Sequence, residues 1–230
     1  ARIPVEVVLA SEFRYCDPII DSRTLVVVIS QSGETLDTMA ALREAKSLGA
    51  RILSIVNVVG SSIARESDDV LYTWAGPEIA VATTKAYSTQ MAVLDLLAIY
   101  LAGQRKTITA EDMRRLTSAI AALPAQVEQI LSNREQIQYY ASQYFNHDSV
   151  FFIGRNLDYA LGMEGSLKLK EISYIHSEAY ASGELKHGTI SLIEPGTLVV
   201  ALGSYTPLFD KAMSNVIEVK AKIGRASCRE

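Results

Sequence analysis

Short runs of apolar residues alternate along the chain with longer segments in which apolar residues recur at helical spacing. The runs predict strands at 5–8, 25–29, 51–57, 70–74, 149–154, 190–193 and 197–202. The periodic segments predict helices at about 34–48, 83–102, 111–133, 135–145, 158–174 and 207–220. Strands that alternate with helices are typical of parallel sheets, and an unbroken apolar run such as 25–29 is typical of a strand covered on both faces. The predicted fold class is therefore α/β, with two doubly wound parallel-sheet domains that carry helices on both faces.

The same pattern predicts four parts, which are a first domain at 1–105, linking helices at 106–145, a second domain at 146–222 and a tail at 223–230. A short repeat supports two copies of one α/β unit, because residues 197–200 (TLVV) match residues 24–27. The first predicted strand has no preceding element to pair with, so we expect the natural protein to begin earlier. The tail resembles a translated sequencing adapter, and we expect it, with Cys228, to be non-native.

A polar turn, Ser30-Gln31-Ser32-Gly33-Glu34-Thr35, joins the strand predicted at 25–29 to the next helix. The amino end of a helix presents free backbone N–H groups, and open α/β sheets bind ligands at this edge. Three hydroxyls, one amide and a glycine that admits a close ligand favour a phosphate monoester. A nucleotide P-loop is disfavoured because no lysine follows the glycine. The alternative is that the hydroxyls only cap the helix.

The composition restricts the partners of the chain. A formal net charge of -4 over 230 residues argues against nucleic acid, which basic surfaces bind. The longest apolar stretch, 91–102, is too short to cross a bilayer and contains Asp95, so no membrane partner is expected. Cys16 and Cys228 form no metal-spaced set and no disulfide framework, and no signal peptide opens the chain. These features favour the reducing cytoplasm.

The helix predicted at 158–174 carries Glu164, Lys168 and Glu171 at i, i+4 and i+7. Residues at this spacing share one face of a helix, here beside an apolar stripe of Leu161, Leu169 and Ile172. A charged stripe next to the core is placed to line a cleft. The alternative is a solvated face stabilised by a glutamate–lysine pair.

A polar segment, 177–188, follows this helix and is predicted to be a loop. It contains Glu184 and His187, and loops dense in titratable groups are common sites of chemistry. A metal set of His176, Glu184 and His187 lacks the spacing of usual ligand pairs, so no metal is expected.

Three segments together resemble the isomerase module of the isomerising glutamine:fructose-6-phosphate aminotransferases, also called glucosamine-6-phosphate synthases. They are the Ser30–Thr35 turn, residues 78–86 (EIAVATTKA) and residues 164–188 (EGSLKLKEISYIHSEAYASGELKHG). That module consists of two sugar isomerase (SIS) domains, and the resemblance covers residues 1–222. Many SIS proteins share the first segment, whereas the last is close to diagnostic of the synthases.

The resemblance implies two sets of binding residues. The sugar phosphate would be held by Ser30, Gln31, Ser32 and Thr35. The sugar would be contacted by Val81 and Thr83, and Thr83 keeps a hydroxyl where the family often has serine. No cofactor and no metal are implied.

The resemblance also implies three catalytic residues. Glu171 would shuttle a proton between C1 and C2 of the sugar, and Lys168 lies beside it. His187 would assist ring opening from the partner subunit of a homodimer. Thr189 stands where the family commonly has proline, which leaves the chemistry untouched.

The implied reaction converts fructose 6-phosphate and ammonia into glucosamine 6-phosphate in hexosamine biosynthesis. In the family an N-terminal glutaminase domain supplies the ammonia, and the chain as given lacks that domain and the C-terminal lysine that forms a Schiff base. We therefore expect the isolated chain not to catalyse the overall reaction. The alternatives are another SIS enzyme, such as a fructosamine-phosphate deglycase or a ketose–aldose isomerase, and a sugar-phosphate sensor without turnover.

Overall fold

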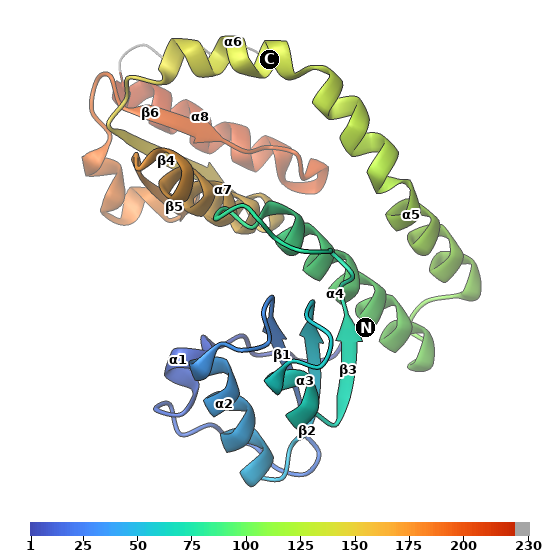
Figure 1. Cartoon of the computed structure of the whole chain (residues 1–230). Coiled ribbons are helices and arrows are strands. Elements are labelled where there is room, and N and C mark those ends of the chain that lie inside the picture. Colours follow the sequence, from blue (N-terminus) through green and yellow to red (C-terminus); the bar gives the residue numbers. More distant parts are fainter. Residues whose placement is uncertain (224–230) are drawn as a thin grey trace. The chain divides into compact units, whose positions relative to one another are not determined.

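The computed structural model describes residues 1–223 and forms two compact units (Figure 1). The first unit is Ala1–Gln129, and the second begins at Ile130. Cys228 and the predicted tail beyond residue 223 lie outside the described residues. The division into two domains joined by helices at 106–145 stays a prediction.

The first unit contains a three-stranded parallel sheet in the order β1-β2-β3. Its register pairs Leu25 with Arg51 and Leu53 with Asp69. The elements are α1 Ala10–Phe13, β1 Leu25–Ser30, α2 Leu36–Ser47, β2 Arg51–Val56, α3 Ser62–Glu66, β3 Asp69–Tyr72 and α4 Thr84–Gln104, followed by α5 Ala110–Ser132, which continues into the second unit.

Helices α2 and α3 pack on one face of this sheet, as Figure 1 shows. The buried cluster is formed entirely by aliphatic residues, namely Val28, Leu42, Ala45, Ala50, Ile52, Val56, Ile63 and Ala64. The opposite face of β1 is more exposed than its apolar run predicts, because Leu25 is 45% and Ile29 41% exposed. The physical reason is that α2 and α3 pack on the face that carries Val28, whereas Leu25 and Ile29 point to the other face.

The second unit contains a parallel sheet in the order β5-β4-β6, so the chain crosses β4 between β5 and β6. Its elements are α6 Arg134–Tyr144, β4 Ser149–Gly154, α7 Leu157–Ser173, β5 His176–Ala181, the 3-10 helices Leu185–His187 and Thr189–Leu192, β6 Leu198–Ala201, the 3-10 helix Thr206–Leu208 and α8 Phe209–Ile223. The α/β class with parallel sheets is confirmed in both units.

Helices cover both faces of the second sheet. On one face α7 approaches β4 closely, since a Cβ added at Gly165 would lie 3.2 Å from the Phe152 ring. On the other face Ile153 packs in a buried cluster with residues of the connection and of α8, which are Leu185, Ile193 and Val219. Successive side chains of β4 therefore point to different helices, as the pleat of a strand requires.

Three predicted elements are wrong. Residues 5–8 form no strand, and residues 190–193 lie mainly in a 3-10 helix instead of a strand. The first half of the predicted loop 177–188 is strand β5. An apolar pattern such as that of residues 5–8 indicates burial but does not identify a strand to pair with. Residues 176–181 are polar, yet they form a strand because they pair with β4.

Candidate functional site

The polar turn lies where the sequence places it, between the carboxyl end of β1 and the amino end of α2. Ser30 ends the strand, and its Oγ accepts a hydrogen bond from the Gly33 N–H at 3.1 Å. The same Oγ lies 3.2 Å from the Thr35 hydroxyl. Ser32 Oγ accepts from the Glu34 N–H at 3.2 Å. The turn is thus a compact group of hydroxyls at the start of a 12-residue helix.

Helix capping does not account for these hydroxyls. Thr35 is the N-cap residue of α2, yet its side chain makes no capping hydrogen bond. Ser32 and Thr35 are exposed, and Gln31 Oε1 is buried without a hydrogen-bond partner among the described residues. A buried polar atom without a partner calls for a ligand or water, and a helix amino terminus favours an anion. The turn therefore presents the exposed hydroxyls of Ser32 and Thr35 to an anionic ligand, while Gln31 Oε1 can accept a hydrogen bond from a ligand hydroxyl or from water.

Residues 61–63, at the start of α3, pack against the turn, although the sequence analysis did not connect the two segments. Gly33 has a φ of +67°, and a Cβ there would lie 2.1 Å from Ser61 Oγ. The Ile63 N–H donates to the Gly33 carbonyl at 3.0 Å, and the Ser62 N–H donates to Glu34 Oε1 at 2.8 Å. Hydrogen bonding from Ser62 lowers the pKa of the Glu34 carboxyl below its ordinary value. No sequence signal links residues 61–63 to the turn, because the contact depends on the parallel pairing of β1 with β2, which brings the loops after both strands together.

Val81 and Thr83 lie in the connection before α4. The helix begins at Thr84, and Thr83 is its N-cap residue with a left-handed backbone. The Thr83 hydroxyl donates to the Val81 carbonyl at 2.8 Å, and the Val81 side chain is 85% exposed. The Thr83 hydroxyl therefore supports a local turn in this structure.

The three charged residues of α7 form one group in the second unit. Lys168 Nζ lies 2.5 Å from Glu171 Oε2 and 3.6 Å from Glu164 Oε1. The three side chains are only 20–31% exposed, so they do not form a solvated face. The hydrogen bond to Glu171 raises the pKa of the Lys168 ammonium, although burial opposes this change. One ammonium is thus held between two carboxylates in a partly dehydrated position.

The stripe predicted beside this group is wrong. Leu161 is 49% and Ile172 64% exposed, and the buried positions of α7 are Asp158, Gly162 and Ser166. Ser166 and Ser177 bring α7 and β5 together, since their Oγ atoms are 3.0 Å apart and Ser177 Oγ donates to the Ser166 carbonyl at 2.8 Å. Small side chains permit this close packing, so the helix turns its small residues to the sheet.

His187 lies on a different element from Glu171, the 3-10 helix Leu185–His187 that follows β5. Its side chain is exposed, and its N–H donates to the Glu184 carbonyl at 3.0 Å. His176 is at the opposite end of β5, near Ser149 and Glu178, so it does not join His187. Within residues 1–223 no group of three or more candidate ligands could hold a metal ion.

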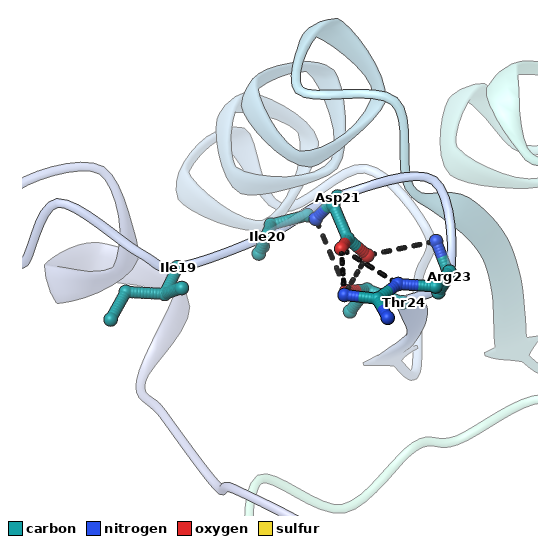
Figure 2. Close-up of a pocket in the computed structure, with 5 residues that line it drawn as sticks. All are labelled: Ile19, Ile20, Asp21, Arg23 and Thr24. Carbon is teal, nitrogen blue, oxygen red and sulfur yellow. Dashed lines mark hydrogen bonds and ion pairs between the residues drawn. The ribbon is translucent and has the colours of Figure 1, made fainter.

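Two surface depressions lie away from these groups. One of about 390 Å³ lies before β1, where the Asp21 carboxylate binds the Arg23 guanidinium at 2.7 Å, and is lined by Ile19, Ile20, Asp21, Arg23 and Thr24 (Figure 2). The other, of about 500 Å³, is lined by residues at or just before the starts of β4, β5 and β6, including His147 and His176. Both lie toward the amino ends of strands, whereas the Ser30–Thr35 turn follows a carboxyl end.

Known proteins of one name are similar to this chain over nearly its whole length. The isomerizing glutamine–fructose-6-phosphate aminotransferase of Clostridium acetobutylicum is 57% identical over 222 residues, which are 96% of this chain and 36% of that protein. The protein of the same name from Caldanaerobacter subterraneus subsp. tengcongensis is 59% identical over 97% of this chain and 37% of its own length. The chain thus spans little more than a third of these relatives.

Solved structures give the same result for the fold. The C-terminal domain of the glucosamine-fructose-6-phosphate aminotransferase from Francisella tularensis has a TM-score of 0.93 and 40% identity, covering 96% of this chain and 63% of that one. A glucosamine-6-phosphate deaminase from Thermotoga maritima has a TM-score of 0.67 at 23% identity and supports the fold alone. Across residues 1–223, no helix has the length and apolar content that a membrane span requires. A family model described as SIS domain matches residues 1–100 and 143–226, and the chain belongs to this family.

Proposed function

We propose that the chain is the isomerase part of an isomerizing glutamine–fructose-6-phosphate aminotransferase. The observation that carries the proposal is the partly buried Glu164–Lys168–Glu171 group on α7. Proton transfer at carbon needs a base held in a fixed position, which a carboxylate of this group can supply, whereas a sugar-phosphate sensor needs only the binding turn. The identity of 57–59% to enzymes of this name supports the choice of substrate.

The binding residues act through hydrogen bonds and the helix dipole. Ser30, Gln31, Ser32 and Thr35 would hold the phosphate of fructose 6-phosphate at the start of α2, where the dipole favours an anion. Val81 and Thr83 would contact the sugar itself. Binding energy from the phosphate, which does not react, then orients C1 and C2.

The reaction replaces the C2 carbonyl oxygen of the open sugar by nitrogen from ammonia, with loss of water. Glu171 would then take a proton from C1 and deliver it to C2, while the C1 hydroxyl gives up its proton and the imine nitrogen gains one, which yields the amino aldose. Lys168 binds Glu171 Oε2 and leaves Oε1 to receive the proton. His187 would assist opening of the sugar ring before this step.

The partners of the whole protein belong to the same proposal. They are fructose 6-phosphate and glucosamine 6-phosphate, a second copy of the chain that contributes its histidine, and a glutaminase domain as the source of ammonia. The cytoplasm is the expected compartment, consistent with the free thiol of Cys16.

A chimera tests this function. This chain would replace the corresponding segment of the Clostridium acetobutylicum relative, and glucosamine 6-phosphate would be assayed with glutamine and fructose 6-phosphate. The unaltered relative and the chimera with Glu171→Gln are the controls. We expect activity in the chimera and none in the Glu171→Gln form. A correctly folded chimera that forms no glucosamine 6-phosphate would contradict the proposal.

A further inference from the structure

A buried amide connects the two loops that follow β4 and β5. Asn215 of α8 is 4% exposed. Its Oδ1 accepts hydrogen bonds from Arg155 Nε at 3.0 Å and from Ser182 Oγ at 3.1 Å. Arg155 directly follows β4, and Ser182 directly follows β5. One oxygen atom of α8 thus holds the carboxyl ends of two neighbouring strands.

The orientation of this amide is set by its other end. Asn215 Nδ2 donates to Glu218 Oε2 at 3.2 Å, one turn further along α8. A carboxylate accepts and does not donate, so the nitrogen faces Glu218 and the oxygen faces the two loops. The amide therefore has a partner for each of its polar atoms.

The loop after β5 is enclosed by this arrangement. The Ser182 N–H donates to the Gly154 carbonyl at 2.8 Å. A Cβ added at Gly183 would lie 2.9 Å from Arg155 Nη2 and 3.2 Å from its Cζ, so the guanidinium covers the glycine. Arg155 is itself held by Asn215, and the loop lies against both.

This loop leads directly into the 3-10 helix that carries His187. The Glu184 N–H donates to the Ala181 carbonyl at 2.8 Å, and the His187 N–H donates to the Glu184 carbonyl at 3.0 Å. Leu185, between them, is 2% exposed and packs in the core cluster with α8. A displacement of Ser182 is therefore transmitted to His187 within five residues of chain.

We propose that Asn215 is a positioning residue for His187. It acts through Ser182, Arg155 and the 182–188 segment, and its link to catalysis rests on the proposed function. An apolar residue of similar size could fill the same volume, but only an acceptor can bind both loops. The buried amide thus fixes the geometry of the loop through its hydrogen bonds, in addition to filling space in the core.

The first experiment measures amide hydrogen exchange in the 230-residue chain. The test variant is Asn215→Leu, which removes the acceptor and keeps the volume. The control is Ser142→Ala, which removes an exposed hydroxyl of α6 that binds the Tyr139 carbonyl and not Asn215. We expect exchange at 182–188 to become about ten-fold faster in Asn215→Leu, as the loss of these hydrogen bonds predicts, and unchanged in Ser142→Ala.

A rescue variant separates positioning from a general loss of stability. Asn215→Asp combined with Glu218→Gln keeps an acceptor for Arg155 and Ser182 and reverses the donor and acceptor between positions 215 and 218. We expect slow exchange to return in this double variant. If Asn215→Leu does not fold, Ser182→Ala removes one of the same hydrogen bonds with a smaller change. Exchange at 182–188 that matches the unaltered chain in Asn215→Leu, or in Ser182→Ala if that is the variant used, would overturn the proposal.

The second experiment measures kinetics in the chimera. We expect Asn215→Leu to lower kcat about ten-fold with little change in the KM for fructose 6-phosphate, because misplacing a catalytic group lowers the rate more than binding. Faster exchange with unchanged kcat would reject the link to His187. An inactive unaltered chimera would instead contradict the proposed function, while the exchange result would still decide whether Asn215 holds the loop.

Discussion

At the scale of single residues, the Ser30–Thr35 turn uses some of its polar groups internally and leaves others available. Ser30 Oγ is buried and binds the Gly33 N–H, whereas the Thr35 hydroxyl lies 3.2 Å from Ser30 Oγ, makes no capping bond and is exposed to a ligand. The exposed hydroxyls are therefore the ones whose loss should affect a ligand more than the fold.

Removal of the Thr35 hydroxyl tests this distinction. Thr35→Ala should weaken binding of fructose 6-phosphate to the chimera about ten-fold or more, because a hydrogen bond to a charged group contributes about 1.5–3 kcal/mol. Calorimetry measures the affinity, and Ser67→Ala is the control, since that hydroxyl binds the Ile63 carbonyl instead. Equal affinities for both variants would show that Thr35 does not bind the phosphate.

Glu171 allows a second test at the same scale. Glu171→Gln keeps the shape of the side chain but cannot act as a base at neutral pH. In the chimera it should stop exchange of the C1 proton of fructose 6-phosphate with solvent while binding remains measurable. Proton NMR in deuterated water follows the exchange, with the exposed Glu194→Gln as control. Exchange at the unaltered rate in Glu171→Gln would assign the proton transfer to another group.

Gly33 and Gly60 form a matched pair, since their φ angles are +67° and +72°. The two glycines differ in their surroundings. A Cβ added at Gly33 would collide with Ser61 Oγ, whereas a Cβ added at Gly60 would have no atom within 4 Å. Gly60→Ala should cost about 1 kcal/mol of unfolding free energy from the backbone alone. Gly33→Ala should cost roughly 1–3 kcal/mol more, as overpacking does. Urea unfolding measures both, and equal losses would mean that Ser61 moves away freely.

At the scale of elements, α7 joins its sheet through polar and small residues. Asp158, which is 3% exposed, accepts from Ser204 Oγ at 2.5 Å and from the Tyr205 N–H at 3.1 Å. These bonds tie the first turn of α7 to the loop after β6. Burial alone would raise the pKa of the Asp158 carboxyl, but hydrogen bonds from Ser204 and Tyr205 lower it below the ordinary value of 3.8.

The lowered pKa predicts a dependence of stability on pH. The ionised carboxylate stabilises the fold fully above pH 3.8, and this contribution is lost as the pH falls through the lower pKa of the folded state. Asp158→Asn should therefore cost about 2 kcal/mol near neutral pH, and its deficit should shrink in acid. Urea unfolding at pH 7 and below pH 3.8 gives the two differences. A deficit that is the same at both pH values would contradict the assignment to the charged form.

At the scale of the whole molecule, each unit has its own buried cluster. A unit with a separate core can unfold without the other. Hydrogen exchange should therefore show Gly33→Ala accelerating exchange mainly within the first unit and Asp158→Asn mainly within the second. Equal acceleration across both units for either variant would show that the chain unfolds as one cooperative body.

The sequence by itself determined the α/β class, most of the helices and strands, and the two groups of candidate residues. Local periodicity and turn chemistry depend on neighbours in the chain, so they can be read without a structure. The Ser30–Thr35 turn and the spacing of Glu164, Lys168 and Glu171 were visible for this reason. The assigned roles of these residues stay predictions until the variants are measured.

Only the tertiary structure decided which distant segments meet. The Ser61 hydroxyl lies against Gly33, polar residues 176–181 pair with β4, and Asn215 binds the loops after two strands. The small residues of α7, and not its large apolar ones, face the sheet. Each of these contacts joins residues far apart in sequence and depends on the shape and hydrogen-bonding capacity of both partners, which no periodicity within one segment records.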